Sequence, residues 1–253
     1  MPQITVHNIE SPSRSDRVFW LLEELESTYD VVTYLRMPTL MGAAPPELFK
    51  HSLFGKGPAL SIDGESFGES GYVLHRILTH PEIMASAPSH IEREQSNWSV
   101  HWAHAAEAAG MTWLQEEDMV AVAGKAWVEG RIGEATPEEL RGMERFSSWY
   151  SWEIDRPQSQ NFIDKGKTEQ WLAEHEGCNF TGTEKFGIGD FMMLAGIHSL
   201  CAGSRSVMGY KVGPHIKAWW QRVSTRPQFL RALERIKTEE NLTLRQQKQK
   251  QWG

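Results

Sequence analysis

Cysteine is scarce in this chain of 253 residues, which contains only Cys178 and Cys201. The two do not form a Cys-x-x-Cys pair, so the sequence predicts neither a disulfide framework nor a cysteine-bound zinc site. The ten histidines include no His-x-x-x-His spacing. We therefore expect no bound metal.

Long apolar runs and an excess of basic charge are also missing. No apolar run approaches the roughly 18 residues that a membrane-spanning helix needs, and the start Met-Pro-Gln-Ile-Thr lacks the features of a signal peptide. The formal net charge is -7 at pH 7, whereas a nucleic-acid-binding protein needs a basic surface to displace counterions from phosphates. We therefore expect a cytoplasmic protein that binds neither membranes nor nucleic acids.

The N-terminal part alternates strand and helix signals. β-branched residues favour strands, apolar residues at three- and four-residue spacing favour helices, and Asp63-Gly64 is typical of a hairpin turn. The expected elements are a strand at 4–9, a helix at 14–26, a strand at 29–35, a short helix at 46–50, strands at 58–62 and 66–68, and a helix at 69–80. The order β-α-β-α-β-β-α predicts a thioredoxin-like fold.

Strand signals disappear after a linker at 80–90 that contains two prolines. Helices are expected at 91–124, 137–176, 189–203, 214–224 and 227–241, which together predict a helical bundle. The predicted fold class is an α/β thioredoxin-like N-terminal domain followed by an all-α C-terminal domain. We place the first domain at 1–82, the second at 90–240 and a polar, solvated tail at 241–253.

Two short motifs have the chemistry of a peptide-binding site. Pro58 follows Gly57 at the start of a strand, where a cis bond exposes the preceding backbone N–H and C=O to a ligand. Glu69 and Ser70 start a helix, where free N–H groups and the positive end of the helix dipole suit a carboxylate. Each motif alone is also typical of an ordinary turn or helix cap.

The order of several motifs resembles the glutathione transferase family, and within it a fungal and bacterial branch. The N-terminal motifs are Ser-Arg-Ser-Asp-Arg-Val-Phe-Trp-Leu-Leu-Glu-Glu-Leu at 13–25, Ala-Pro-Pro-Glu-Leu at 44–48, Gly-Lys-Gly-Pro-Ala-Leu at 55–60 and Glu-Ser-Gly at 69–71. The helical part matches through Phe180-Thr181-Gly182 and Gly187-Ile188-Gly189-Asp190. Here Gly187 stands where the family usually has a Ser or Thr, so Asp190 caps its helix with less side-chain help.

The resemblance implies the thioredoxin-like and helical-bundle architecture of that family, a homodimer, and glutathione as cosubstrate with no further cofactor. The backbone of Gly57, beside Pro58, would pair with the cysteinyl part of glutathione. Glu69 and Ser70 would bind the γ-glutamyl part. Lys56 would reach the glycyl carboxylate, although a solvated lysine is an equal alternative.

The chemistry that the resemblance implies requires a thiolate. Lowering a thiol pKa of about 8.5 by two units takes roughly 2.7 kcal/mol of preferential thiolate stabilisation. Ser13 is the first candidate for the hydroxyl that donates to sulfur and Ser11 the second, with Arg14 as the nearby cation. Ser13 could equally be a helix cap. No tyrosine or cysteine occupies this loop, which disfavours tyrosine-type and glutaredoxin-like branches.

The helical domain is expected to supply an apolar pocket for an electrophile. Its candidate wall consists of Trp98, Trp102, Met111, Trp113 and Met119, although a packed core is the commoner role for such residues. The predicted activity is attack of the thiolate on an electrophilic, aromatic or peroxide substrate. A non-catalytic glutathione-binding or regulatory protein of the same fold is the alternative.

Overall fold

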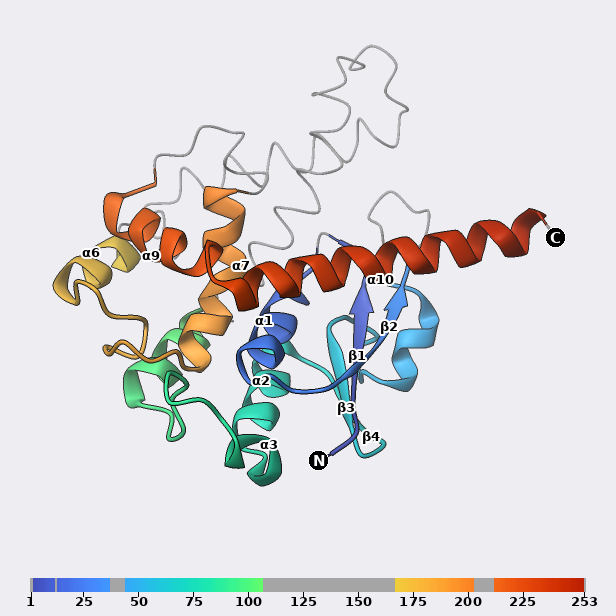
Figure 1. The fold of residues 1–253 in the computed structure, drawn as a ribbon, viewed down its shortest axis with the longest axis horizontal. Helices are drawn as coiled ribbons and strands as arrows, with labels where there is room; N and C mark the ends of the chain where they lie inside the picture. Colours follow the sequence, from blue (N-terminus) through green and yellow to red (C-terminus); the bar gives the residue numbers. More distant parts are fainter. Residues whose placement is uncertain (1, 12, 37–43, 107–166, 203–211, 253) are drawn as a thin grey trace, which may run out of the picture.

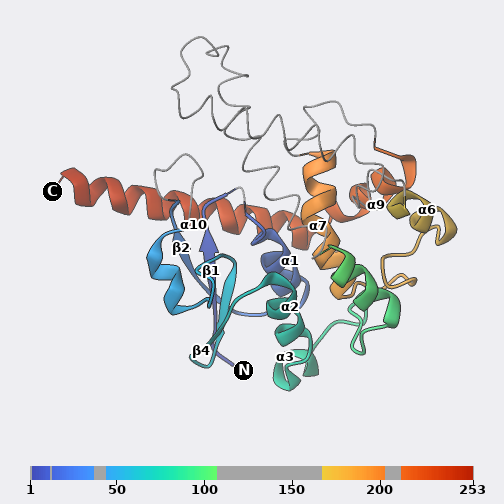
Figure 2. The same cartoon turned by 180° about the vertical axis from the view of Figure 1, so that it is seen from behind.

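The structure is a computed structural model that describes residues 2–11, 13–36, 44–106, 167–202 and 212–252. Figure 1 shows a small sheet with helices beside it at one side of the molecule and a group of helices at the other. A long C-terminal helix crosses both parts, and the view from behind shows the same arrangement (Figure 2). The predicted two-part fold class is confirmed.

The sheet has the strand order β2-β1-β3-β4. The strands are β1 (Ile4–Ile9), β2 (Asp30–Tyr34), β3 (Ala59–Ile62) and β4 (Glu65–Phe67). β1 pairs parallel with β2 and antiparallel with β3, with His7 opposite Ala59. Because β1 and β3 run in opposite directions, the end of β1 and the start of β3 lie at the same edge of the sheet.

The helices of the α/β part follow the predicted order closely. They are α1 (Asp16–Glu24), the 3₁₀ helix η1 (Pro46–Lys50) and α2 (Ser70–Leu78). α1 is buried along almost its whole length, and α2 buries its apolar side, so α1 and α2 pack on each other and on the core. Most predicted boundaries agree with the observed ones within two residues, as expected for helix ends that fray.

The helical part is built around α7 (Ile188–Cys201), which is buried over most of its length. The other described helices are one at 97–106, α6 (Lys167–Glu174), α9 (Pro214–Ser224) and α10 (Pro227–Trp252). A helix that is apolar all round is suited to the middle of a protein rather than to its surface. α7 therefore forms the centre on which α1, α2 and α9 pack.

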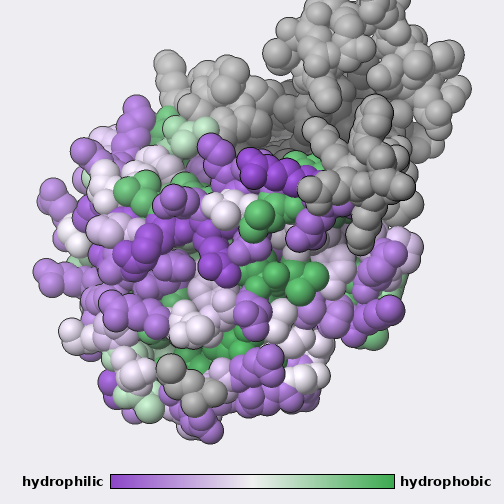
Figure 3. Space-filling view, turned by 45° about the vertical axis from the view of Figure 1, so that its right-hand side comes forward, coloured by the Kyte–Doolittle hydropathy of each residue, from purple (hydrophilic) through white to green (hydrophobic). Residues whose placement is uncertain are grey.

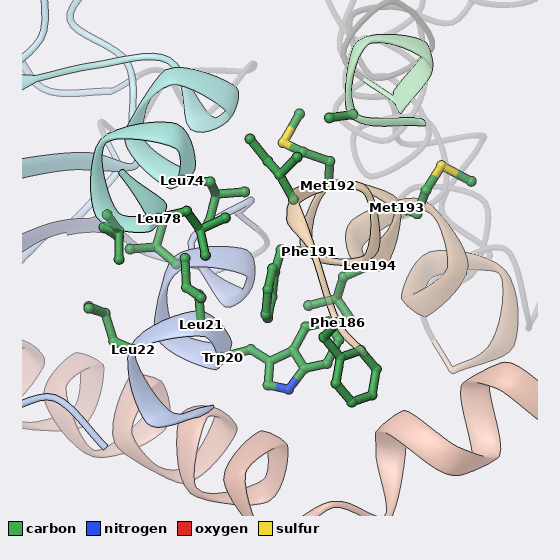
Figure 4. Packing of buried hydrophobic residues seen from close by; sticks show 14 of the residues in the cluster. Trp20, Leu21, Leu22, Leu74, Leu78, Phe186, Phe191, Met192, Met193 and Leu194 are labelled. Atoms are coloured by element: carbon green, nitrogen blue, oxygen red, sulfur yellow. The ribbon is translucent and has the colours of Figure 1, made fainter. Parts of the chain in front are cut away.

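One continuous core joins the two parts through Trp20 of α1. The indole is fully buried and lies with its centroid 4.6 Å from Phe191 and 5.4 Å from Phe186. Figure 4 shows these rings beside the leucines of α1 and α2 and the methionines of α7. Burying aromatic side chains of this size contributes several kcal/mol, so the interface between the parts is a packed core and not a loose contact.

An ion-pair cluster around Glu24 reinforces this junction. The fully buried Glu24 carboxylate accepts hydrogen bonds from Arg226 Nε and Nη2 at 2.6 and 2.7 Å and from the Trp20 indole at 2.8 Å. The Nε2 atom of His90 lies 2.8 Å from Glu24 Oε2. A buried carboxylate is tolerated when it is surrounded by donors in this way.

The structure differs from the sequence prediction at three places. The expected linker at 80–90 contains a short helix, α3 (Pro81–Ala85). The helix expected at 91–124 begins at 97, and its part after 106 lies outside the described residues, as does most of the one expected at 137–176. The helix expected at 227–241 continues to Trp252, so the segment predicted as a polar tail is helical. Residues 242–252 contain no glycine or proline to stop it.

On the side shown in Figure 3, hydrophobic residues form separate patches among hydrophilic ones. Among the described helices, none combines the length and apolar character needed to cross a membrane.

Candidate functional site

The end of β1 and the start of β3 approach each other closely at one edge of the sheet. A Cβ atom placed on Gly57 would lie 2.8 Å from Ile9 Cγ2, so only glycine fits against the end of β1. The peptide bond between Gly57 and Pro58 is cis, as predicted. Ile9 leads directly into the loop that carries Ser11 and Ser13. The predicted serine loop and the predicted Gly57–Pro58 segment therefore meet here.

The start of α2 joins the same region through Arg17. This side chain of α1 is almost completely buried, and its Nη1 lies 3.4 Å from Ser70 Oγ and 3.7 Å from Met192 Sδ. The guanidinium therefore links the first turn of α1, the first residue of α2 and the buried helix α7. Arg17 was not among the predicted site residues, although a charged residue inside the buried face of an amphipathic helix is a signal for such a role.

Glu69 has an unusual backbone conformation just before α2. Its φ is +65°, whereas Ser70 continues into the helix and has its side chain buried. A positive φ in a residue other than glycine is strained and concentrates at binding and active sites. The Glu69 side chain itself is exposed.

The two candidate serines are held differently. The Ser13 oxygen accepts a hydrogen bond from the Ser15 N–H at 3.2 Å, at the turn that leads into α1. Ser11 donates its N–H and its hydroxyl to Glu240 Oε1 of α10, at 2.8 and 2.9 Å. Arg14 is half-buried next to Ser13. Glu240 was not a candidate, because nothing in its local sequence indicates a contact with residues so distant along the chain.

The first turn of α1 also holds a buried carboxylate. Asp16 Oδ1 accepts the Arg17 N–H at 2.8 Å, and its Oδ2 lies 3.4 Å from Nδ1 of His198. The His198 ring stacks on Trp220, with centroids 5.1 Å apart. An acidic side chain in a first turn complements the helix dipole.

Lys56 and its neighbours form the loop that leads to Gly57. Lys56 is exposed and donates its backbone N–H to Ser52 Oγ at 3.3 Å. Ser52 lies against Gly68, where an added Cβ would be 2.6 Å from the Ser52 oxygen. The loop is therefore packed against the chain that leads into Glu69.

A polar network lies beneath this loop, on the side of the sheet that carries η1. His7 Nε2 is 2.8 Å from Ser61 Oγ and its Nδ1 is 3.2 Å from the Tyr34 hydroxyl, while the ring stacks on His51 at 3.7 Å. Burial, and then the nearby His51, lower the pKa of His7 to about 4. His51 belongs to the same network, because its Nδ1 lies 3.3 Å from Ser66 Oγ.

The predicted electrophile-binding residues are only partly within the described chain. The rings of Trp98 and Trp102 pack at tilted angles against Trp171 of α6, with centroids 4.4 and 5.8 Å away. Trp102 is buried and Trp98 is half exposed. Met111, Trp113 and Met119 lie outside the described residues. Within the described ranges, no group of three or more His, Cys, Asp or Glu could hold a metal ion.

Comparison with known proteins finds glutathione transferases among both the curated proteins and the solved structures. Glutathione S-transferase 3 of Schizosaccharomyces pombe is 28% identical over 248 residues, which cover 95% of this chain and 90% of that protein. The crystal structure of the glutathione transferase URE2P5 of Phanerochaete chrysosporium matches with a TM-score of 0.64 at 17% identity, covering 96% of this chain and 98% of that one. The chain is related to the glutathione transferases and has their fold. The structure of Ure2p in complex with glutathione also matches, with a TM-score of 0.60, 16% identity and 92% and 94% coverage. No family model matches.

The start of α7 has Gly187 at the position where the glutathione transferases usually have a Ser or Thr. Asp190 Oδ2 accepts the Gly187 N–H at 3.0 Å, and its Oδ1 accepts the Phe180 N–H at 2.9 Å and the Trp219 indole at 3.3 Å. Complete burial nevertheless raises the pKa of Asp190 to about 7. The expectation of weaker side-chain capping needs correction, because other residues supply the missing cap.

Those residues come from the segment before the helix at 97–106 and from that helix. Gln95 Oε1 accepts the Ile188 N–H at 2.7 Å, and Ser99 Oγ accepts the Gly189 N–H at 3.1 Å. In an ordinary N-cap, the hydroxyl of the capping residue itself accepts one of these first N–H groups. Ser99 thus takes over the role that the family usually gives to the residue at position 187.

Proposed function

We propose that this protein is a glutathione transferase that binds glutathione at the edge where β1 ends, β3 begins and α1 and α2 start. The observation that carries the proposal is the meeting of three sequence segments at this edge, through the close approach of Gly57 to Ile9 and the Arg17–Ser70 contact. Such an edge presents free backbone groups and two helix N-termini to one ligand.

The tripeptide fits this edge group by group. The backbone of Gly57, before Pro58, would pair with the cysteinyl unit as an added strand does. The γ-glutamyl carboxylate would accept hydrogen bonds from the first N–H groups of α2 and from the Ser70 hydroxyl, with buried Arg17 supplying positive charge. The Glu69 carboxylate would face the γ-glutamyl ammonium. The strained backbone of Glu69 supports this assignment.

Activation would lower the pKa of the bound thiol. A hydroxyl of the loop before α1 donates to the sulfur, and the N-terminal end of α1 stabilises the same negative charge. Arg14 adds a positive charge at this turn. The thiol proton leaves to solvent, and the thiolate sulfur then attacks the electrophilic carbon of an apolar substrate and displaces its leaving group. Lys56 would bind the glycyl carboxylate, and a peroxide is a second acceptable electrophile.

The experiment compares the wild type with Ser13→Ala. Glutathione binding is measured by calorimetry, conjugation to an activated aryl halide by absorbance, and the pKa of the bound thiol by ultraviolet titration of the thiolate. We expect a bound pKa of about 6 to 7, from a reference of about 8.5, and an increase of about one unit in the variant. Conjugation at pH 6.5 should slow about tenfold in the variant and much less at pH 9.

Two outcomes would count against the proposal. No glutathione binding by the wild type would exclude it altogether. Binding with no conjugation and no thiolate would favour the alternative, a glutathione-binding protein without catalysis.

Ser70→Ala is the companion variant, expected to weaken glutathione binding by about 1 to 3 kcal/mol through the loss of a hydrogen bond to a charged group.

A further inference from the structure

The loop between β1 and α1 is anchored on both sides. On one side, the Glu10 N–H donates to the Tyr34 carbonyl at 2.9 Å, while Arg36 donates its N–H to Glu10 Oε2 and its Nε–H to the Glu10 carbonyl. On the other side, Ser11 donates both of its polar hydrogens to one oxygen of Glu240. The hydroxyl of Ser11 is therefore already committed to a carboxylate.

The hydroxyl of Ser13, in contrast to that of Ser11, acts as an acceptor. Its oxygen accepts the Ser15 N–H, which leaves the hydroxyl proton available. Among the residues that the structure describes, no acceptor takes that proton. A hydroxyl whose oxygen already accepts a hydrogen bond is polarised and becomes a better donor.

Glu240 is carried on a firmly packed part of α10. One turn earlier, Ile236 is buried and the Arg235 guanidinium lies 5.7 Å from the centre of the Tyr29 ring, while Arg235 also pairs with Glu239 at 3.0 Å. α10 packs on both α1 and β2, and Figures 1 and 2 show it lying across them. The carboxylate that binds Ser11 is thus fixed by the fold and not by a loose tail.

We propose that Glu240 is a positioning residue for thiol activation, because it holds Ser11 away from the glutathione sulfur and sets the loop so that Ser13 is the donor. This inference rests on the proposed function. It deepens that function by assigning the activating serine and by giving the C-terminal helix a part in the active site.

The charges around Ser11 support the same choice. A thiolate bonded to Ser11 Oγ would lie within about 6 Å of the Glu240 carboxylate, given ordinary hydrogen-bond lengths. Turning Ser11 toward the sulfur would also remove a donor from that carboxylate. Two negative charges at this distance raise the pKa of the thiol, which is the opposite of what catalysis needs.

The test uses the full-length protein and four variants on the loop and α10. They are Ser11→Ala, Glu240→Ala, the double variant, and Glu240→Gln, which keeps an oxygen acceptor but removes the charge. Glu234→Ala is the matched control, since Glu234 is an exposed residue of the same helix. Thermal unfolding verifies that each variant is folded, and kcat and KM for glutathione are measured separately.

We expect Glu240→Ala to lower kcat about fivefold, and Ser11→Ala to lower it less because the backbone N–H bond to Glu240 remains. In both variants KM for glutathione should change less than twofold, because the peptide is bound elsewhere. The double variant should lose no more than Glu240→Ala alone, since Glu240→Ala already removes both bonds to Ser11. Glu240→Gln should recover most of the wild-type kcat, and Glu234→Ala should equal the wild type.

Two results would overturn the assignment. One is a bound-thiol pKa that rises in Ser11→Ala and stays unchanged in Ser13→Ala, which would make Ser11 the donor. The other is a Glu240→Ala variant that has the kcat of the wild type, while the wild type binds and conjugates glutathione. This second result would overturn the role of Glu240 and leave the proposed function intact. A wild type that binds no glutathione overturns both proposals together.

Discussion

His7 shows how one residue can set the acid sensitivity of this fold. It lies in the middle of β1 with almost no exposed surface, and both of its ring nitrogens have partners in Ser61 and Tyr34. The stacked ring of His51 adds a second group that would repel a proton on His7. The neutral ring is therefore strongly favoured in the folded state.

The prediction for His7 concerns stability between pH 7 and pH 4. Since its pKa is lowered from 6.5 to about 4 on folding, the unfolded chain binds the proton first, and stability is fully present above pH 6.5 and is lost as the pH falls toward 4. The contribution is at most about 3 kcal/mol. In urea unfolding at several pH values, the free energy of unfolding of His7→Gln should fall less between pH 7 and pH 4 than that of the wild type. His75→Gln, at an exposed position of α2, is the control. Equal pH slopes in His7→Gln and the wild type would refute the prediction.

At the scale of the element, α7 shows why a glycine can replace a capping residue. The backbone of Gly187 is extended, with φ of -131°, so any residue could adopt it. Crowding is what requires glycine, because an added Cβ would collide with Ser99 Oγ and lie 2.5 Å from Glu92 Oε2. The hydroxyl that caps α7 therefore comes from Ser99 and not from the residue at position 187.

This exchange predicts that two substitutions compensate for each other. Gly187→Ser should destabilise the protein by about 1 to 2 kcal/mol, since it displaces the Ser99 hydroxyl from the Gly189 N–H. Ser99→Ala should cost about 1 kcal/mol by removing the same bond. The double variant should be more stable than the sum of the two changes, because Ser99→Ala removes the oxygen that the new Cβ would meet first, and the new hydroxyl can then cap α7. Chemical unfolding of all four proteins measures the coupling, and strict additivity would contradict the explanation.

Elements were predictable where their local signals were strong. The period of Val18, Leu21 and Leu25 predicted α1, and Asp63-Gly64 predicted the hairpin between β3 and β4, because these signals act over a few residues. The residues that the sequence did not reveal, Arg17 and Glu240, act through contacts between distant segments.

The end of the last helix was predicted too early, at 241, for a different reason. Its polarity indicated solvent exposure, and residues 245–247 are indeed exposed, yet good helix formers without a stop signal extend α10. The binding roles of the predicted site residues stay predictions. What the structure adds is their placement at one edge, which the motifs alone did not establish.

At the scale of the whole molecule, one short surface segment is unusually apolar. Phe49, Leu53 and Phe54 lie at and after the end of η1 with 64%, 83% and 58% of their surfaces exposed. Large apolar side chains grouped in this way commonly mark an interaction surface. The segment is next to Gly55, against which the Phe49 ring packs, so it is presented by an ordered turn.

We predict that the protein is a homodimer, as the glutathione transferase resemblance implies, and that this segment contributes to the interface. Light scattering at micromolar concentration should give about twice the chain mass of 28.8 kDa. Leu53→Glu and Phe54→Glu should each shift the mass toward that of one chain, because a charge buried between subunits has no partner there. Leu230→Glu, at a 52% exposed position of α10, is the matched control and should stay dimeric. A wild type of about 29 kDa would exclude the dimer, whereas a dimer that survives both substitutions would place its interface on another surface.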